Sequence, residues 1–174
     1  MKTFIVLTFI GILTYANAGF VDKCTTPKTV LDNFQAPKYH KGTWYVTHVK
    51  ESPNDCQILR TSQKGDTSIV EHDFTHNGIN GEQHCEALPK AEKRLTFTCK
   101  FGDESIDTTV QIVMATDYEN YSLYYLCSTF TSGPYKGRTV DNYLLASRKG
   151  IDAEIPDKLK SLTSGLNLQK CIYS

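Results

Sequence analysis

Beyond its first eighteen residues, the sequence has no apolar run long enough to cross a bilayer, and it has no block or stripe of basic residues. The first absence argues against a membrane-spanning helix in that part of the chain. The second, together with a balance of 19 basic against 19 acidic residues, removes the usual signature of nucleic-acid or anionic-membrane binding. We therefore expect neither nucleic acid nor a membrane as a partner.

The sequence also lacks the short motifs that carry catalysis, among them G-x-S-x-G, H-E-x-x-H and a phosphate-binding loop. It has no C-x-x-C pair, which argues against a zinc site. The paired acids Asp103 and Glu104 fall in an expected turn, where they would be solvated. Because no nucleophile, base and orienting group can be named together, we expect no catalysis, no metal and no cofactor.

The N-terminus has the pattern of a secretory leader. Lys2 precedes an apolar run, and residues 16–18 have the A-x-A form of a cleavage signal. This pattern predicts a signal peptide at 1–18 and a single secreted, extracellular domain at 19–174.

Six cysteines come after the leader, an even number that predicts three disulfides in a secreted chain. Cys85 and Cys99 lie equally far from residue 92, in the middle of an expected turn. In antiparallel strands that turn there, the two residues face each other, so a direct cross-strand bridge fits. The chain-entropy model gives such a short loop a stabilisation of about 3 kcal/mol.

Period-2 alternation between turn residues predicts an all-β chain. The turns are short, which implies antiparallel neighbours. We expect eight strands, at residues 43–50, 56–62, 67–75, 81–87, 94–101, 107–115, 121–130 and 140–148.

A helical period comes after the last strand, with apolar residues at 155, 159 and 162. Pro156 suits the first turn of this helix and Gly165 suits its end. Eight antiparallel strands favour a closed barrel, which has no exposed edges and can hold one small ligand. A two-sheet sandwich is the alternative that pattern alone leaves open.

Three short patterns occur in order along the chain. Gly42 precedes Trp44 by two residues at the start of the first strand, residues 116–118 read Thr-Asp-Tyr, and Arg148 closes the last strand. With the eight strands and the helix, this set resembles the three signature regions of the lipocalins. The stretches KGTWYVTH, ATDYENYSLYYLC and EIPDKLK are similar to those of salivary lipocalins of blood-feeding bugs, the triabin and procalin group.

The resemblance implies a fold and a set of structural residues. Trp44 would close the floor of an eight-stranded antiparallel barrel, with Arg148 across its ring as a cation–π pair. Gly42 would let the chain pass close beneath before the strand begins. The resemblance also pairs Cys24 with Cys127 and Cys56 with Cys171, which puts Cys127 on the outside of the barrel.

Strand parity then selects the side chains that would face a cavity. Trp44 sets the parity of its strand, Cys127 sets that of 121–130, and the apolar face is taken as inward elsewhere. The expected cavity residues are Val46, His48, Val70, His72, Phe74, Ile112, Tyr124, Leu126, Ser128 and Phe130. Complete filling of the barrel by these side chains is the commoner outcome for apolar strands; the resemblance favours an open cavity.

The resemblance implies a monomeric carrier in saliva that sequesters a small host mediator, an eicosanoid or a biogenic amine, and so suppresses haemostasis or inflammation. An alternative from the same family is a protein that inhibits a host coagulation protease through its outer surface, where Tyr135 beside Lys136 and Arg138 would contribute. A weaker alternative is haem carriage, because His72 aligns with the haem-ligating histidine of the related nitrophorins. Asn120 begins an N-glycosylation sequon at an expected surface turn.

Overall fold

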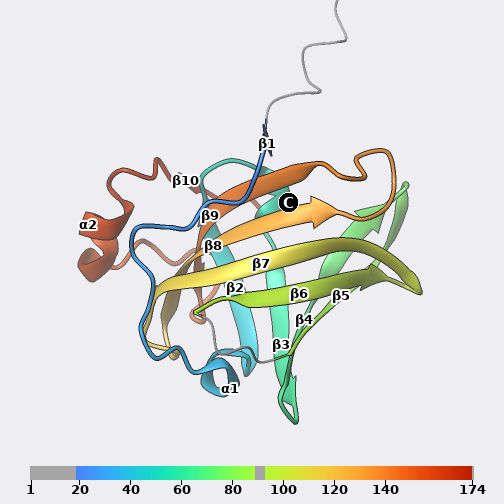
Figure 1. Ribbon diagram of the computed structural model, residues 1–174. Coiled ribbons are helices and arrows are strands. Elements are labelled where there is room, and N and C mark those ends of the chain that lie inside the picture. Colours follow the sequence, from blue (N-terminus) through green and yellow to red (C-terminus); the bar gives the residue numbers. More distant parts are fainter. Residues whose placement is uncertain (1–18, 89–92, 174) are drawn as a thin grey trace, which may run out of the picture.

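The computed structural model describes residues 19–88 and 93–173 and shows an antiparallel β-barrel (Figure 1). The expected signal peptide at 1–18 lies outside the described residues. Within the described part of the chain, none of the helices has the length and apolar character needed to span a membrane.

Eight strands form the barrel wall, and each pairs with the next along the chain. They are β2 (Gly42–Val49), β3 (Ile58–Lys64), β4 (Thr67–His76), β5 (Ile79–Ala87), β6 (Leu95–Phe101), β7 (Glu104–Thr116), β8 (Tyr121–Phe130) and β9 (Thr139–Ser147). Pairing of β9 with β2 closes the barrel, which decides between the barrel and the sandwich. All eight strands were predicted from the sequence, with ends that differ by a few residues.

A small helix, α1 (Ala36–Tyr39), plugs one end of the barrel. The backbone carbonyl of Tyr39 accepts a hydrogen bond from Trp44 Nε1 at 3.0 Å and another from Arg148 Nη2 at 2.9 Å. Tyr39 and Trp44 are almost fully buried there. We call this end, formed by Tyr39, His40 and Trp44, the floor. A helix of four residues is too short for its periodicity to be recognised in the sequence.

Two further short strands extend the sheet of the barrel wall. β1 (Phe20–Val21) pairs with β9, and β10 (Gln169–Lys170) pairs with β2. Between β9 and β10 the chain forms a 3₁₀ turn, η2 (Asp157–Leu159), which continues into α2 (Lys160–Thr163). The predicted C-terminal helix is therefore confirmed, but it is short.

The three disulfides are those expected. Cys24 is bonded to Cys127, Cys56 to Cys171, and Cys85 to Cys99. Cys85 and Cys99 are direct cross-strand partners of β5 and β6, as their spacing predicted. The first two bridges connect residues more than a hundred positions apart, and they attach the N-terminal segment to β8 and the C-terminal segment to the loop before β3.

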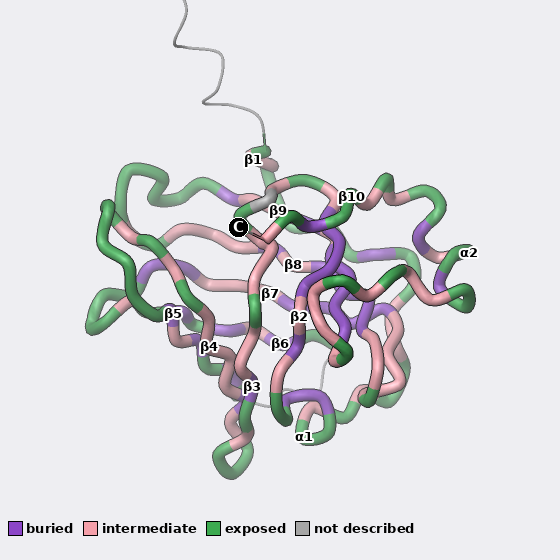
Figure 2. The backbone as a smooth tube through the Cα atoms, turned by 180° about the vertical axis from the view of Figure 1, so that it is seen from behind, coloured by how far each residue is buried: buried purple, intermediate pink, exposed green. Residues whose placement is uncertain are grey.

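The chain buries apolar residues on both sides of its wall. Figure 2 shows buried residues concentrated in the strands around β8 and β9. Inside, Tyr124 and Leu144 pack with Trp44 at the floor. Outside, Leu123 packs with Leu159 below the C-terminal segment, and the N-terminal segment covers another outer cluster. This double coverage explains why strand β8 is apolar on both faces.

Candidate functional site

The barrel encloses a cavity of about 1540 Å³ that is closed by the floor and opens among the loops at the other end. Its lining combines aliphatic and aromatic side chains with a comparable number of polar ones. Concave sites with apolar walls and convergent polar groups are typical of small-molecule binding, although this cavity is larger and has more polar side chains than most. The barrel is thus an open cup, and its side chains do not fill it.

Most of the cavity residues expected from sequence line this cavity. They are Val46, Val70, His72, Phe74, Tyr124, Leu126, Ser128 and Phe130. The cavity residues of β4 and β8 follow from simple alternation along each strand. Cys127 lies outside the barrel, where it is bonded to the N-terminal segment. Their binding role remains a prediction, because lining a cavity is a position and not yet a function.

The expectation for His48 was wrong. The pairing of β2 with β9 shifts between Val46 and His48, so Thr47 forms a β-bulge. A bulge inserts one residue and reverses the parity of the strand beyond it. His48 therefore lies on the outer side, beside Lys170 of β10, its cross-strand partner. Burial lowers the pKa of its imidazole. Nothing in the alternation of this strand marks the bulge.

The expectation for Ile112 was also wrong. Ile112 packs outside the barrel with Tyr125 and Cys127, beneath the N-terminal segment. The neighbouring residue pair explains why: Val110 is the cross-strand partner of Cys127, so both lie on the outer face. In β7 the inward face is the polar one, and the apolar face is covered by another segment. If the outward position of Cys127 is applied to its neighbours on β7, the sequence alone places Ile112 outside the barrel.

Because the polar face of β7 points inward, this strand brings a carboxylate into the cavity. Asp107 lines it and is almost fully buried. Gln83 Nε2 donates a hydrogen bond to Asp107 Oδ2 at 2.7 Å, and Thr109 Oγ1 donates one to Oδ1 at 2.7 Å. The Thr109 hydroxyl also lies 2.6 Å from that of Ser128. Burial raises the pKa of the Asp107 carboxyl.

A second carboxylate enters from the loop between β2 and β3. Asp55 ends the 3₁₀ turn η1 (Pro53–Asp55) and lines the cavity. Asn142 Nδ2 donates a hydrogen bond to Asp55 Oδ2 at 2.7 Å, and Asn142 Oδ1 accepts from two backbone N–H groups of the same loop. Burial raises the pKa of Asp55 too. Sequence reasoning placed Asp55 in a turn and missed its inward orientation, which depends on Asn142.

His72 lies close enough to both acids for each of them to raise its pKa. Burial has the larger effect, and the net result is a pKa below the usual histidine value. Its Nδ1 is 3.0 Å from the carbonyl oxygen of Asp73. At neutral pH the ring is therefore uncharged and does not neutralise Asp55 or Asp107, which we call the inner carboxylates.

Three polar atoms near the floor make no hydrogen bond of ordinary geometry among the described residues: His40 Nε2, Gln111 Oε1 and the Tyr124 hydroxyl oxygen. His40 and Gln111 are nevertheless close enough to interact with each other, whereas the Tyr124 hydroxyl has no such neighbour. All three residues line the cavity. Tyr124 is 1% exposed and His40 is 1% exposed. Burial lowers the pKa of His40 to about 4, and the Gln111 side chain raises it slightly. We call these three the floor atoms.

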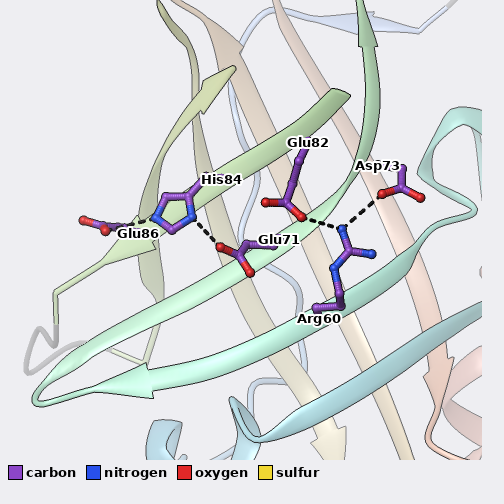
Figure 3. A network of polar contacts seen from close by, with 6 residues as sticks. All are labelled: Arg60, Glu71, Asp73, Glu82, His84 and Glu86. Atoms are coloured by element: carbon purple, nitrogen blue, oxygen red, sulfur yellow. Dashed lines mark hydrogen bonds and ion pairs between the residues drawn. The ribbon is translucent and has the colours of Figure 1, made fainter. Parts of the chain in front are cut away.

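None of the described residues that line the cavity is a lysine or an arginine. Four further acids line it. Asp73 and Glu82, which we call the outer acids, are paired with Arg60 on the outer face of the sheet, at 3.1 and 2.8 Å (Figure 3). Glu51 is paired with Lys50 at 3.2 Å, and Asp141 accepts a hydrogen bond from the Tyr125 hydroxyl at 2.9 Å. Beside them, His84 bridges two more outer carboxylates. Asp73, Glu82 and Glu51 therefore have cationic partners in the protein, whereas the inner carboxylates, like Asp141, have hydrogen-bond donors only.

The remaining candidates lie at the ends of the barrel. Arg148 lies across the ring of Trp44, as expected. Asn120 donates from Nδ2 to Asp117 Oδ2 at 2.9 Å in the β7–β8 turn, and its glycosylation remains a prediction. Tyr135 packs against Phe20 and Phe130 at the mouth of the cup. Among the described residues, no group of three or more His, Cys, Asp or Glu is placed to hold a metal ion.

Comparison with known proteins gives consistent results across the chain. The family model described as Triabin matches residues 18–162. Procalin of Hospesneotomae protracta is 42% identical over 173 residues, which cover 98% of this chain and 99% of that protein. Triabin of Meccus pallidipennis is 34% identical over 161 residues, with 90% and 97% covered. Among solved structures, LTBP1 in complex with leukotriene C4 is 27% identical with a TM-score of 0.64, covering 84% of this chain and 92% of that one.

Proposed function

The chain belongs to the triabin family of lipocalins, and from this membership we propose that it is a secreted salivary carrier. Cleavage after Ala18 releases the domain at 19–174 into saliva. There it sequesters a small host mediator, an eicosanoid or a biogenic amine, and so suppresses haemostasis and inflammation during blood feeding.

The observation that carries this proposal is the cavity of about 1540 Å³, whose lining combines apolar walls with convergent polar groups. It has room for a mediator of either class. The similarity to LTBP1, solved with leukotriene C4, supports the use of this kind of cup for a small molecule.

The mechanism is capture by mass action. A carrier that performs no chemistry lowers the free concentration of a mediator only when it is present in comparable amount and binds tightly. An affinity in the submicromolar range corresponds to roughly 8 kcal/mol or more of binding free energy. Burial of an apolar body in the cup supplies much of this, and the polar groups select the ligand.

Haem is a less suitable ligand for this lining. His72 does face the cup, and the charged groups that act on it are the two inner carboxylates and Arg60 of the outer face. The two propionates of haem would add negative charge to the same cup, in which none of the described lining residues is a lysine or an arginine.

The test is calorimetric titration of the disulfide-bonded domain with a thromboxane analogue, a leukotriene, serotonin, noradrenaline and haem. We expect submicromolar one-to-one binding of one mediator. Leu126→Trp, which fills the middle of the cup, should remove that binding. Leu88→Trp, a change at a residue 66% exposed on the surface, is the matched control and should leave it unchanged.

Failure of the whole panel would refute the carrier proposal. Inhibition of a coagulation protease by both the wild type and Leu126→Trp, with no small ligand present, would instead indicate that the outer surface carries the function.

A further inference from the structure

Among the described residues that line the cup, the side chains with a full charge at neutral pH are all acidic. Asp55 and Asp107 approach it from different parts of the wall, one from the loop after β2 and the other from β7. Both line the same cavity as His72, and both are close enough to it to raise its pKa. The polar partners that hold them are amides and a hydroxyl, namely Asn142, Gln83 and Thr109.

Buried carboxylates are usually paired with a cation, because an uncompensated charge in an apolar environment is costly. Here the neutral partners fix the orientation of each carboxylate but leave its charge in place. The outer acids show the contrast, since Arg60 bridges two of them (Figure 3). The inner carboxylates are thus oriented for a positive group that the described lining residues do not supply.

The floor atoms provide a second, independent indication of a ligand. The Tyr124 hydroxyl is fully buried, has no partner among the described residues, and lies close enough to Asp55 to interact with it electrostatically. Buried hydroxyl and imidazole groups are ordinarily hydrogen-bonded. Tyr124 therefore offers a polar contact to a molecule that reaches the floor.

The walls between these groups are apolar and aromatic. Phe74 and Phe97 come from β4 and β6, and Leu126 comes from β8. A flat aromatic body fits against such side chains. A metal ion would leave these walls without a role, and no three-ligand metal cluster occurs among the described residues.

We propose that the mediator captured by this cup is an organic cation, an amine with an aromatic body that carries a hydroxyl group. Its ammonium lies at the inner carboxylates Asp55 and Asp107, and its hydroxyl reaches the Tyr124 hydroxyl at the floor. This inference rests on the proposed carrier function and narrows it to one of the two mediator classes. A mediator whose only charge is a carboxylate meets like charge in the same place and is disfavoured.

The first test compares three probes that share one ring system and differ in charge: serotonin, its neutral alcohol 5-hydroxytryptophol, and the anion 5-hydroxyindoleacetate. Each is titrated calorimetrically into the wild-type domain at neutral pH. We expect serotonin to bind at least tenfold more tightly than the alcohol, and the alcohol more tightly than the acid. Equal affinities across the series would overturn the inference, because charge would then have no part in selection.

The second test removes each inner carboxylate with little change in shape. Asp107→Asn and Asp55→Asn should weaken serotonin at least tenfold while changing affinity for 5-hydroxytryptophol less than threefold. Glu86→Gln, an outer carboxylate bonded to His84, is the matched control and should change neither. Circular dichroism and urea unfolding establish that each variant is folded, and the wild-type probe series stands even if one variant is not.

The third test titrates a leukotriene or thromboxane analogue into the same domain. Tight binding of such a carboxylate lipid, without binding of serotonin or noradrenaline, would overturn the organic-cation inference and leave the carrier function standing. Binding of neither class would refute both.

Discussion

The guanidinium carbon of Arg148 lies 3.9 Å from the centroid of the Trp44 ring. The same guanidinium donates hydrogen bonds to three backbone carbonyls, those of Tyr39 at 2.9 Å, Thr43 at 3.2 Å and Tyr118 at 2.8 Å. One side chain at the end of β9 thereby ties together α1, the start of β2 and the β7–β8 turn. The floor of the cup depends on this arrangement.

Replacement of Arg148 by alanine should destabilise the protein by about 3 kcal/mol, because it removes the cation–π contact and leaves three carbonyls without a charged donor. Arg148→Lys should recover only part of this, since an ammonium cannot reproduce the fork of the guanidinium. Urea unfolding monitored by Trp44 fluorescence measures both changes.

Arg138→Ala is the control for this prediction. Arg138 also lies over an aromatic ring, 4.2 Å from the centroid of Phe20, but it is exposed at the mouth. An exposed pair of this kind contributes about 0.5–1 kcal/mol. Equal effects of Arg148→Ala and Arg138→Ala would show that the floor arrangement adds nothing beyond one cation–π contact.

Asp117 should be the most important residue of the turn between β7 and β8. Its carboxylate accepts hydrogen bonds from the backbone N–H groups of Asn120 at 2.7 Å and Tyr121 at 3.1 Å, and from that of Glu119 at 3.2 Å. We expect Asp117→Ala to cost about 3 kcal/mol, because hydrogen bonds to a charged acceptor are stronger than neutral ones.

The pH dependence of this effect follows from the low pKa of Asp117, about 2, to which hydrogen bonds from Asn120 and its neighbours contribute. A lowered pKa gives stability that is present above the unfolded value of 3.8 and is lost as pH falls toward 2. The difference between wild type and Asp117→Ala should therefore shrink in acid. Asp103→Asn, in the exposed β6–β7 turn, is the control and should have little effect at any pH.

The sequence allowed most of the barrel to be predicted because its strands alternate strongly and Cys127 fixes the parity of β8. The interior was less accessible. The bulge at Thr47 changes parity without any residue that marks it, so His48 was misplaced. Ile112 was misplaced because an apolar face can be buried beneath a terminal segment as well as inside a barrel.

The inner carboxylates were missed for related reasons. Asp107 faces inward only because β7 has its polar side inside, which is the reverse of the usual pattern. Asp55 lies in a turn segment, where sequence reasoning expects solvated acids, and Asn142 from the distant strand β9 draws it into the cup. Both orientations depend on tertiary contacts that local pattern does not contain.

The long-range disulfide should contribute more stability than the hairpin disulfide. Cys56 and Cys171 are 115 residues apart, whereas Cys85 and Cys99 are 14 apart. In the chain-entropy model these loops give about 5 and about 3 kcal/mol respectively. We expect the double variant Cys56→Ala with Cys171→Ala to unfold at lower urea than Cys85→Ala with Cys99→Ala. The reverse order would show that loss of packing around Cys85 and Cys99 outweighs chain entropy.

His40 should make the protein sensitive to mild acid. The ring is 1% exposed, its Nδ1 lies 3.1 Å from the carbonyl oxygen of Ala36, and burial lowers its pKa from 6.5 to about 4. A lowered histidine pKa gives stability that is present above the unfolded value and is lost as pH falls through the folded one. Over this window the loss attributable to His40 is about 3 kcal/mol.

The measurement is the free energy of unfolding of wild type and His40→Gln from pH 7.5 to pH 4. The inner carboxylates have raised pKa values and act in the opposite direction, gaining stability as pH falls, but both proteins retain them, so the difference isolates His40. His84→Gln is the control of opposite sign. Hydrogen bonds to Glu86 and Glu71 raise the pKa of His84, so its contribution is present at low pH and is lost as pH rises. Parallel curves for wild type and His40→Gln would mean that the buried ring does not resist protonation, and the floor of the cup would then be more accessible to water than its packing indicates.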